Sequence, residues 1–287
     1  MKLSLSAQQL RLPEFWLLAI GAGLMAIHLS LVSQSNVAEF QGNCLVFWAA
    51  AVSLLWRKRD ELEFRSSLIA SSIGIGLLTI ALLRIHLAPD LGLFLRLFPL
   101  ITGLGLALLA SGFKNIRCYW REFAVFTLLA VPPTLLSSIV EISPFTARFS
   151  TVLLWLGGFD VHRQGVYIFL TNGAAVEVYH GCSGIVVILQ VLKFVGLALL
   201  LFPSTWLQRI VIPIAGVAIA FFTNAIRVAI LAILSAPGSK PAFDYWHDGT
   251  GSLMFSMLAV SMTGAICYFW LLSDPVEDSI EEHAEDW

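Results

Sequence analysis

The chain has 287 residues, of which 58% are hydrophobic and only 13% are charged, and its mean hydropathy is +0.83. A soluble domain averages about 45–50% apolar and about 25% charged residues, so this composition excludes an ordinary soluble protein and is typical of one that crosses a membrane several times. The net charge of −2 is uninformative about nucleic acid, and we expect no nucleic-acid partner. The cysteines show no CxxC or CxxH spacing, so we expect no metal and no cofactor.

Apolar segments recur along the chain, and about 20 such residues are needed to cross the hydrocarbon core of a bilayer. The fifth segment contains Pro132 and Pro133, which we expect to kink it. The first has no clear cleavage site and is expected to be retained. We therefore predict an all-α polytopic membrane protein with about eight transmembrane helices. The predicted spans are 15–33, 42–56, 66–87, 92–112, 122–141, 184–203, 209–235 and 251–272.

Lysine and arginine residues in the connections set the expected orientation of these helices. The N-terminus, "WRKRDELEFR", "FKNIRCYWRE" and "PSTWLQR" carry them, whereas "SQSNVAEFQ" has none and "RIHLAPDLG" has one. With eight spans, the basic connections and both termini fall on one side, which we assign to the cytoplasm, with the protein in the inner (plasma) membrane. The acidic tail, 274–287, is then cytoplasmic and is expected to be solvated.

Two longer segments, 142–183 and 236–250, fall on the extracytoplasmic side in this arrangement. The first begins with "SPFTARFSTVLLWLGGF", which predicts an amphipathic helix lying in the membrane interface. It continues with "GVYIFLTNGAAVEVYH", in which two β-prone runs around Asn-Gly predict a β-hairpin before the sixth span. The predicted regions are a five-helix membrane region (1–141), an extracytoplasmic segment (142–183), a three-helix catalytic membrane region (184–273) and the acidic tail (274–287).

Cys182, in "VYHGCSGI", is the first candidate for chemistry because it lies at the outer end of the sixth span. Its small neighbours allow another backbone to approach closely. The N-terminus of a helix also stabilises a thiolate through its dipole and its free amides. Two other interpretations stay open: a small buried hydrophobic residue, or a disulfide with Cys44.

Arg227 is the second candidate, since a charged residue inside a span is a functional hypothesis by default. It follows Arg209 by 18 residues, which places it about 27 Å along the helix, in the outer leaflet. Asn224 lies three residues earlier, on the same helix face. A guanidinium there could bind a peptide carbonyl or stabilise an oxyanion. The alternative is an arginine that extends to the outer headgroups.

His247 is the third candidate, in "KPAFDYWHDGTG" shortly before the last span. Asp244 and Asp248 flank it, and either carboxylate could orient the ring of a general acid or base. His180 is an alternative base, because it precedes Cys182 by two residues and would share its face if the strand continued.

The orientation derived from charge alone puts Cys182, Arg227 and His247 on one side of the membrane at similar depth. Together they could supply a nucleophile, an electrostatic clamp and a proton-transfer group. Of the remaining polar residues, Lys193 lies near the middle of the sixth span and is expected to pair within the bundle. Glu141 is either a partner of the site or a surface group.

Three motifs in the sequence resemble the exosortase/archaeosortase family: "EVYHGCSGI" around Cys182, "TNAIRVAIL" around Arg227 and "YWHDGTG" around His247. Their order, their spacing and their placement at the outer ends of successive spans also match. The resemblance is strongest from about residue 151 to 269, and within the family it is greatest to the cyanobacterial branch.

The resemblance implies a polytopic membrane cysteine protease or transpeptidase that cleaves precursors with a C-terminal sorting signal. Such a signal has a short motif such as Pro-Glu-Pro, a transmembrane helix and a basic tail. The implied roles are nucleophile for Cys182, oxyanion or substrate clamp for Arg227, and general acid/base for His247. The implied partners are membrane-anchored precursors, the lipid bilayer, and an acceptor amine or lipid.

Two alternatives remain from the sequence. "GCSG" also fits the serine motif of rhomboid-type intramembrane proteases, with Ser183 as nucleophile, although that interpretation gives Arg227 no role. A non-enzymatic transporter or an assembly factor for surface polysaccharide is the other alternative. Transport usually requires polar residues near the middle of the membrane, and the chain has few.

Overall fold

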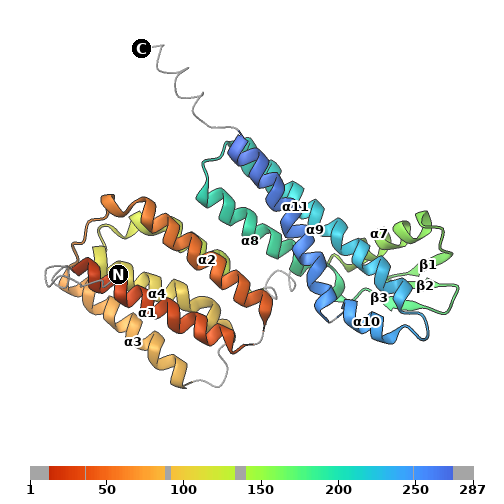
Figure 1. Ribbon diagram of the computed structural model, residues 1–287, viewed down its shortest axis with the longest axis horizontal. Helices are drawn as coiled ribbons and strands as arrows, with labels where there is room; N and C mark the ends of the chain where they lie inside the picture. The colour runs from red at the N-terminus through yellow and green to blue at the C-terminus, as the bar shows by residue number, and fades with distance from the viewer. Residues whose placement is uncertain (1–12, 36, 88–91, 133–139, 248, 274–287) are drawn as a thin grey trace, which may run out of the picture. The chain divides into compact units, whose positions relative to one another are not determined.

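The computed structural model describes residues 13–35, 37–87, 92–132, 140–247 and 249–273, and Figure 1 shows that most of them are helical. The chain divides into two compact units, Met1–Pro132 and Pro133–Trp287, and each is described by itself. All the candidate site residues belong to the second unit. The predicted acidic tail lies outside the described residues.

The first unit is a set of helices joined by short connections (Figure 1). Small residues bring α3 and α4 together, since a Cβ added at Gly74 would lie 2.7 Å from the carbonyl oxygen of Gly105. Such close backbone contacts are typical of helix pairs in membranes. The elements are α1 (Pro13–Ser33), α2 (Ala38–Arg57), η2 (Arg59–Glu61), α3 (Leu68–Leu87), α4 (Gly92–Ser111), η3 (Ile116–Tyr119) and α5 (Trp120–Ala130).

His28 is a fully buried polar side chain that joins three helices of this unit. Its Nε2 lies 2.8 Å from the carbonyl oxygen of Leu95, and its Nδ1 accepts a hydrogen bond of 2.9 Å from the indole of Trp48. Because an indole nitrogen can only donate, the His28 proton is assigned to Nε2 and the ring is neutral. The ring also stacks on Phe98, with centroids 5.5 Å apart. His28 therefore has a structural role.

Six described helices are long and apolar enough to cross a membrane: α1, α2, α3 and α4 in the first unit, and α9 (Trp206–Leu234) and α11 (Thr250–Ser273) in the second. Eight spans were predicted, and the helices at the two other positions are shorter. The sixth predicted span is α8 (Ile185–Leu201), whose 17 residues reach about 26 Å. The structure thus has a polytopic helical fold.

The fifth predicted span, 122–141, differs from the structure in its second half. Helix α5 ends at Ala130 and does not continue with a kink through the proline pair. Val131, with φ −61° and ψ 114°, is extended. This is the conformation that a following proline imposes on its neighbour, because the α region is sterically disfavoured there. Residues 133–139 lie outside the described residues.

The second unit is built around α9, whose 29 residues contact α7 (Ser143–Leu156), α8 and α11 (Figure 1). The start of α9 carries a capping box, in which Thr205 and Gln208 each bond the other's backbone amide. The Gln208 side chain also donates to the carbonyl of Trp270 at 2.9 Å, which joins the start of α9 to the end of α11. A short helix, α10 (Lys240–His247), connects α9 to α11.

A three-stranded antiparallel sheet lies against α7 and α9 (Figure 1). Its strands are β1 (Val161–Gln164), β2 (Tyr167–Leu170) and β3 (Ala175–Glu177), in that order. The predicted hairpin corresponds to β2 and β3, and Gly173 with φ +83° supplies the expected left-handed turn residue. Strand β1 was not predicted, because a single glycine, Gly165, makes its turn to β2.

The inner face of this sheet belongs to the hydrophobic core of the unit. Ile168 and Val178 are fully buried and belong to the same cluster as Ala147 of α7 and Val228 of α9. Cys182 is part of this cluster as well. The sheet therefore fixes the position of the segment that follows it, which contains the candidate nucleophile.

Candidate active site

Cys182 lies in a 3-10 turn, η4 (His180–Cys182), that ends directly before α8. The alternation pattern predicted that His180 and Cys182 lie on one face of a strand. They lie in a 3-10 turn instead. The Cys182 amide donates to the carbonyl of Tyr179 at 2.8 Å, and the Cys182 carbonyl accepts 2.9 Å from the side-chain amide of Asn224. Only 3% of Cys182 is exposed. These bonds hold the cysteine rigidly at the start of α8.

Gly184 connects this turn to α8 in the left-handed conformation, with φ +96°. A Cβ at this position would lie 2.7 Å from Nδ2 of Asn224, closer than real Cβ contacts allow. The glycine is thus required for two reasons, the backbone conformation and the close approach of α9. The small neighbours of Cys182 in the sequence already predicted the second reason.

His247 is the last residue of α10, and its imidazole faces the cysteine. Its Nε2 lies 3.4 Å from Sγ of Cys182. The ring stacks on Phe243, one helical turn earlier, with centroids 5.1 Å apart and planes 14° from parallel. A thiol and an imidazole at this distance can exchange a proton, which is the requirement for an activated cysteine.

Tyr179 is a third group at this site, and it was not predicted from the sequence. Its hydroxyl lies 3.4 Å from Nε2 of His247, the nitrogen that also faces Cys182. The aromatic rings of Tyr179 and His247 have centroids 6.0 Å apart. Nothing in the local pattern distinguishes this tyrosine, because its approach to His247 depends on the 3-10 turn that follows it.

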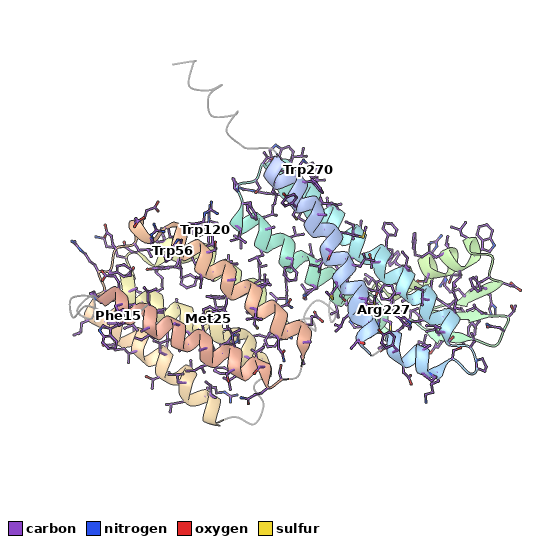
Figure 2. All side chains as sticks on the ribbon, in the orientation of Figure 1. Phe15, Met25, Trp56, Trp120, Arg227 and Trp270 are labelled. Carbon is purple, nitrogen blue, oxygen red and sulfur yellow. The ribbon has the colours of Figure 1, made fainter. Side chains whose placement is uncertain are left out.

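Arg227 lies on α9, in the region where Figure 2 shows α9, α10 and the start of α11 close together. One guanidinium nitrogen, Nη2, donates to the backbone carbonyl of His247 at 2.8 Å. Nη1 lies 3.5 Å from the side-chain oxygen of Asn224. The Nε atom is buried and has no partner among the described residues. Arg227 therefore ties the histidine segment to α9 and keeps one donor available.

His180, the alternative base, pairs with a different residue. Its Nδ1 lies 3.1 Å from a carboxylate oxygen of Glu141, which precedes α7 outside the long helices. Ser143, whose amide donates to a carboxylate oxygen at 2.9 Å, and His180 lower the pKa of Glu141 to about 2. Glu141 is therefore a carboxylate at neutral pH, and it orients His180. The imidazole that lies next to the Cys182 thiol is that of His247 and not that of His180.

Ser183, the nucleophile of the rhomboid-type alternative, is fully buried. Its hydroxyl oxygen accepts a hydrogen bond of 3.3 Å from the amide of Ile185, at the start of α8. Its carbonyl accepts a hydrogen bond of 2.7 Å from the hydroxyl of Thr146 on α7. Both hydrogen bonds are typical of a residue with a structural role at the N-terminus of a helix, here α8.

The remaining sequence candidates lie elsewhere. Cys44 lies in α2 of the first unit and Cys182 in the second unit, and each is a thiol. Lys193 is buried in α8, with 4% of the residue exposed. Within the described residues, no three histidine, cysteine or acidic side chains are placed to hold a metal ion.

The fold and the site define a polytopic membrane protein in which a thiol and an imidazole meet at the end of a helix bundle. The sequence profile of the transmembrane exosortase family matches residues 33–264, and the chain belongs to this family. Exosortases are transmembrane enzymes of the protease or transpeptidase type that act on exported proteins with sorting signals. Neither the curated proteins nor the solved structures contain a significant match.

Proposed function

We propose that this protein is a cysteine protease or transpeptidase that cleaves the C-terminal sorting signals of exported, membrane-anchored precursors. The observation that carries the proposal is the 3.4 Å separation of Cys182 Sγ and His247 Nε2, two atoms whose residues are 65 positions apart. A core cysteine has no need of an imidazole partner. A cysteine nucleophile does, because the thiolate is the reactive form.

In the proposed reaction, the Cys182 thiol passes its proton to Nε2 of His247, and the thiolate attacks the carbonyl carbon of the scissile peptide bond. The carbon–nitrogen bond then breaks as His247 returns the proton to the leaving amine. That amine departs with the C-terminal helix of the precursor, and the rest of the precursor is held as a thioester on Cys182. Water or an acceptor amine attacks this thioester and regenerates the thiol.

Arg227 has two roles in this proposal. Through Nη2 it holds the backbone of His247, which fixes the imidazole against the thiol. Its buried Nε, which bonds none of the described residues, is a donor for the carbonyl oxygen of the substrate, which becomes negatively charged in the tetrahedral intermediate. A preorganised donor at a developing oxyanion is usually the largest single contribution to such catalysis.

The sheet provides a place for the segment that precedes the scissile bond. Strand β3 is an edge strand, and it leads within a few residues into η4 and Cys182. An extended peptide that adds to this edge would gain main-chain hydrogen bonds and arrive at the nucleophile. The orientation derived from charge puts this end of the helices on the extracytoplasmic side of the inner membrane.

The direct test is to capture the acyl-enzyme. We expect a reporter precursor to form an adduct with the wild-type protein that hydroxylamine cleaves, as it does a thioester. Cys182→Ala should abolish both this adduct and processing, whereas Cys118→Ala, which removes an exposed thiol of the first unit, should change neither. Ser183→Ala should keep the adduct. Normal processing by Cys182→Ala, or loss of the adduct only in Ser183→Ala, would reject the cysteine mechanism.

A further inference from the structure

An apolar groove runs between α8 and α11 in the second unit. Its volume is about 300 Å³, and no acidic or basic side chain lines it. The hydroxyl of Thr263, one of the few polar groups at its wall, is already bonded to the carbonyl of Ala259 at 2.8 Å. The occupant that this groove fits is therefore apolar along its whole length. Its lining includes Val191 and Val195 of α8, Phe202 directly after α8, and Val260, Gly264 and Leu271 of α11.

The groove lies along the later parts of α8 and α11, toward the end of these helices that is away from Cys182. Its first lining residue on α8, Val191, lies six residues after Ile185, or about 9 Å along the helix. Helix α8 ends about 15 Å further along, at Leu201, and Phe202, the next residue, also lines the groove. Together these lengths approach the hydrocarbon thickness of about 30 Å. A segment held at Cys182 and continuing across the membrane would pass along this groove.

Gly264 gives the groove the character of a helix-packing surface. A Cβ added there would meet no atom within 4 Å, so the glycine backbone faces open space. Small residues at such positions allow a second helix to approach closely in a membrane, where association depends on packing. Tyr268, one turn later, has 62% of its surface exposed beside the groove.

We propose that this groove binds the transmembrane helix of the precursor during cleavage. The proposal rests on the proposed function, because it places the helix that follows the scissile bond. The charge of the chain beyond α11 is complementary to such a helix. Residues 274–287 contain seven acidic residues and no lysine or arginine. A helix ending on the cytoplasmic side is followed by basic residues under the positive-inside rule.

Site-specific photocrosslinking tests this placement. A photoreactive phenylalanine replaces Tyr268, and its matched control replaces the adjacent Phe269, which is 67% exposed but does not line the groove. Both are made in Cys182→Ala, so that capture does not require catalysis. The probe is an exported reporter with a Pro-Glu-Pro motif, an apolar helix of about 20 residues and an arginine tail.

We expect position 268 to crosslink the reporter's helix and position 269 to give little product. Neutralising the seven acidic residues as Asn and Gln should lower the yield at 268. Crosslinks from 268 to lipid only, to residues 13–130 of the same chain or to a second copy would overturn the proposal. Equal reporter yields at 268 and 269, or none at 268, would overturn it as well.

Filling the groove gives a second measurement. Gly264→Leu places a side chain in open space, and should lower processing of the anchored reporter at least tenfold while leaving alkylation of Cys182 by a small thiol reagent unchanged. Gly23→Leu, at an equally open glycine of α1, is the control and should process normally. Normal processing by Gly264→Leu would reject the groove. If the thioester is found without a crosslink at 268, the groove alone is rejected; a crosslink without a thioester rejects only the cysteine chemistry.

Discussion

Two histidines, one in each unit, show how the same side chain serves different purposes in this protein. His28 is sealed within the first unit, with a carbonyl on one ring nitrogen and an indole on the other. His247 ends a short helix, and its Nε2 faces a thiol and a phenol. A histidine whose two nitrogens are engaged by fixed structural groups stabilises a fold. His247 instead faces a thiol, and in the reaction that we propose it transfers a proton.

The two units also differ in the partners of a positively charged side chain, Lys58 in the first unit and Arg227 in the second. In the first unit, Lys58 bonds the carboxylate of Glu122 at 2.7 Å, and only 5% of that glutamate side chain is exposed. In the second, Arg227 donates through Nη2 to a backbone carbonyl, and its buried Nε has no partner among the residues that the structure describes. The lysine of the first unit is thus paired with a carboxylate, whereas among the described residues the arginine of the second unit bonds only neutral oxygens.

The largest expected effect comes from exchanging the histidines for glutamine. His247→Gln should lower turnover of a precursor by about 10²- to 10⁴-fold, because general acid–base catalysis is worth that much. His28→Gln should lower stability by about 1–3 kcal/mol, the cost of a disturbed buried hydrogen bond, with normal turnover per folded molecule. Processing rates and thermal unfolding in detergent measure the two. The comparison between the units fails if His247→Gln is destabilised but active.

Arg227→Lys should lower turnover by about 10²-fold, the effect of losing one oxyanion donor. Lysine can still bond the carbonyl of His247, but it has no equivalent of the buried Nε. Single-turnover rates on a fixed amount of folded protein are the appropriate measurement. Wild-type rates would mean that Arg227 acts only through the backbone of His247.

Gly184→Ala should be destabilising as well as inactive. Its φ of +96° costs an L-residue about 1–3 kcal/mol, and the new Cβ would displace Asn224 from the cysteine turn. Gly76→Ala in α3 is the matched control, because a Cβ there meets no atom within 4 Å. Thermal unfolding and thiol alkylation rates report the two consequences. Equal behaviour of the two variants would show that the turn tolerates a side chain.

Tyr179→Phe should have the smallest effect, a loss of about two- to tenfold in turnover, which corresponds to one neutral hydrogen bond. The tyrosine hydroxyl shares Nε2 of His247 with the thiol, so we also expect the pH dependence of turnover to change. Tyr167→Phe on β2 is the control, because 44% of that tyrosine is exposed and it lies on the sheet. An unchanged pH profile in Tyr179→Phe would remove the tyrosine from the site.

The sequence predicted the helical segments, because apolar length is a pattern that is local in the chain. The side of the membrane that the site faces stays a prediction from lysine and arginine counts. Apolar length identifies a span, and lysine and arginine counts orient it. This reasoning brought Cys182, Arg227 and His247 to one region, and the structure puts the first and third within 3.4 Å. Their catalytic roles remain a proposal.

What the sequence could not predict depends on contacts between distant segments. The ending of α5 at Ala130 was missed because the two prolines were treated as a kink inside a longer span. Choosing between His180 and His247 required the position of Glu141, 39 residues away from His180. Tyr179 was missed for the same reason, since it reaches His247 across 68 residues.

The fit between Gly184 and Asn224 has a consequence for comparing related chains. The left-handed backbone at residue 184 and the 2.7 Å approach to Asn224 each disfavour a side chain there, and a smaller residue at position 224 would relieve only the second. Homologues that cleave are therefore expected to keep the glycine, whatever residue stands at position 224. A homologue that has lost the glycine is expected to have lost the ability to cleave, even where its cysteine is retained.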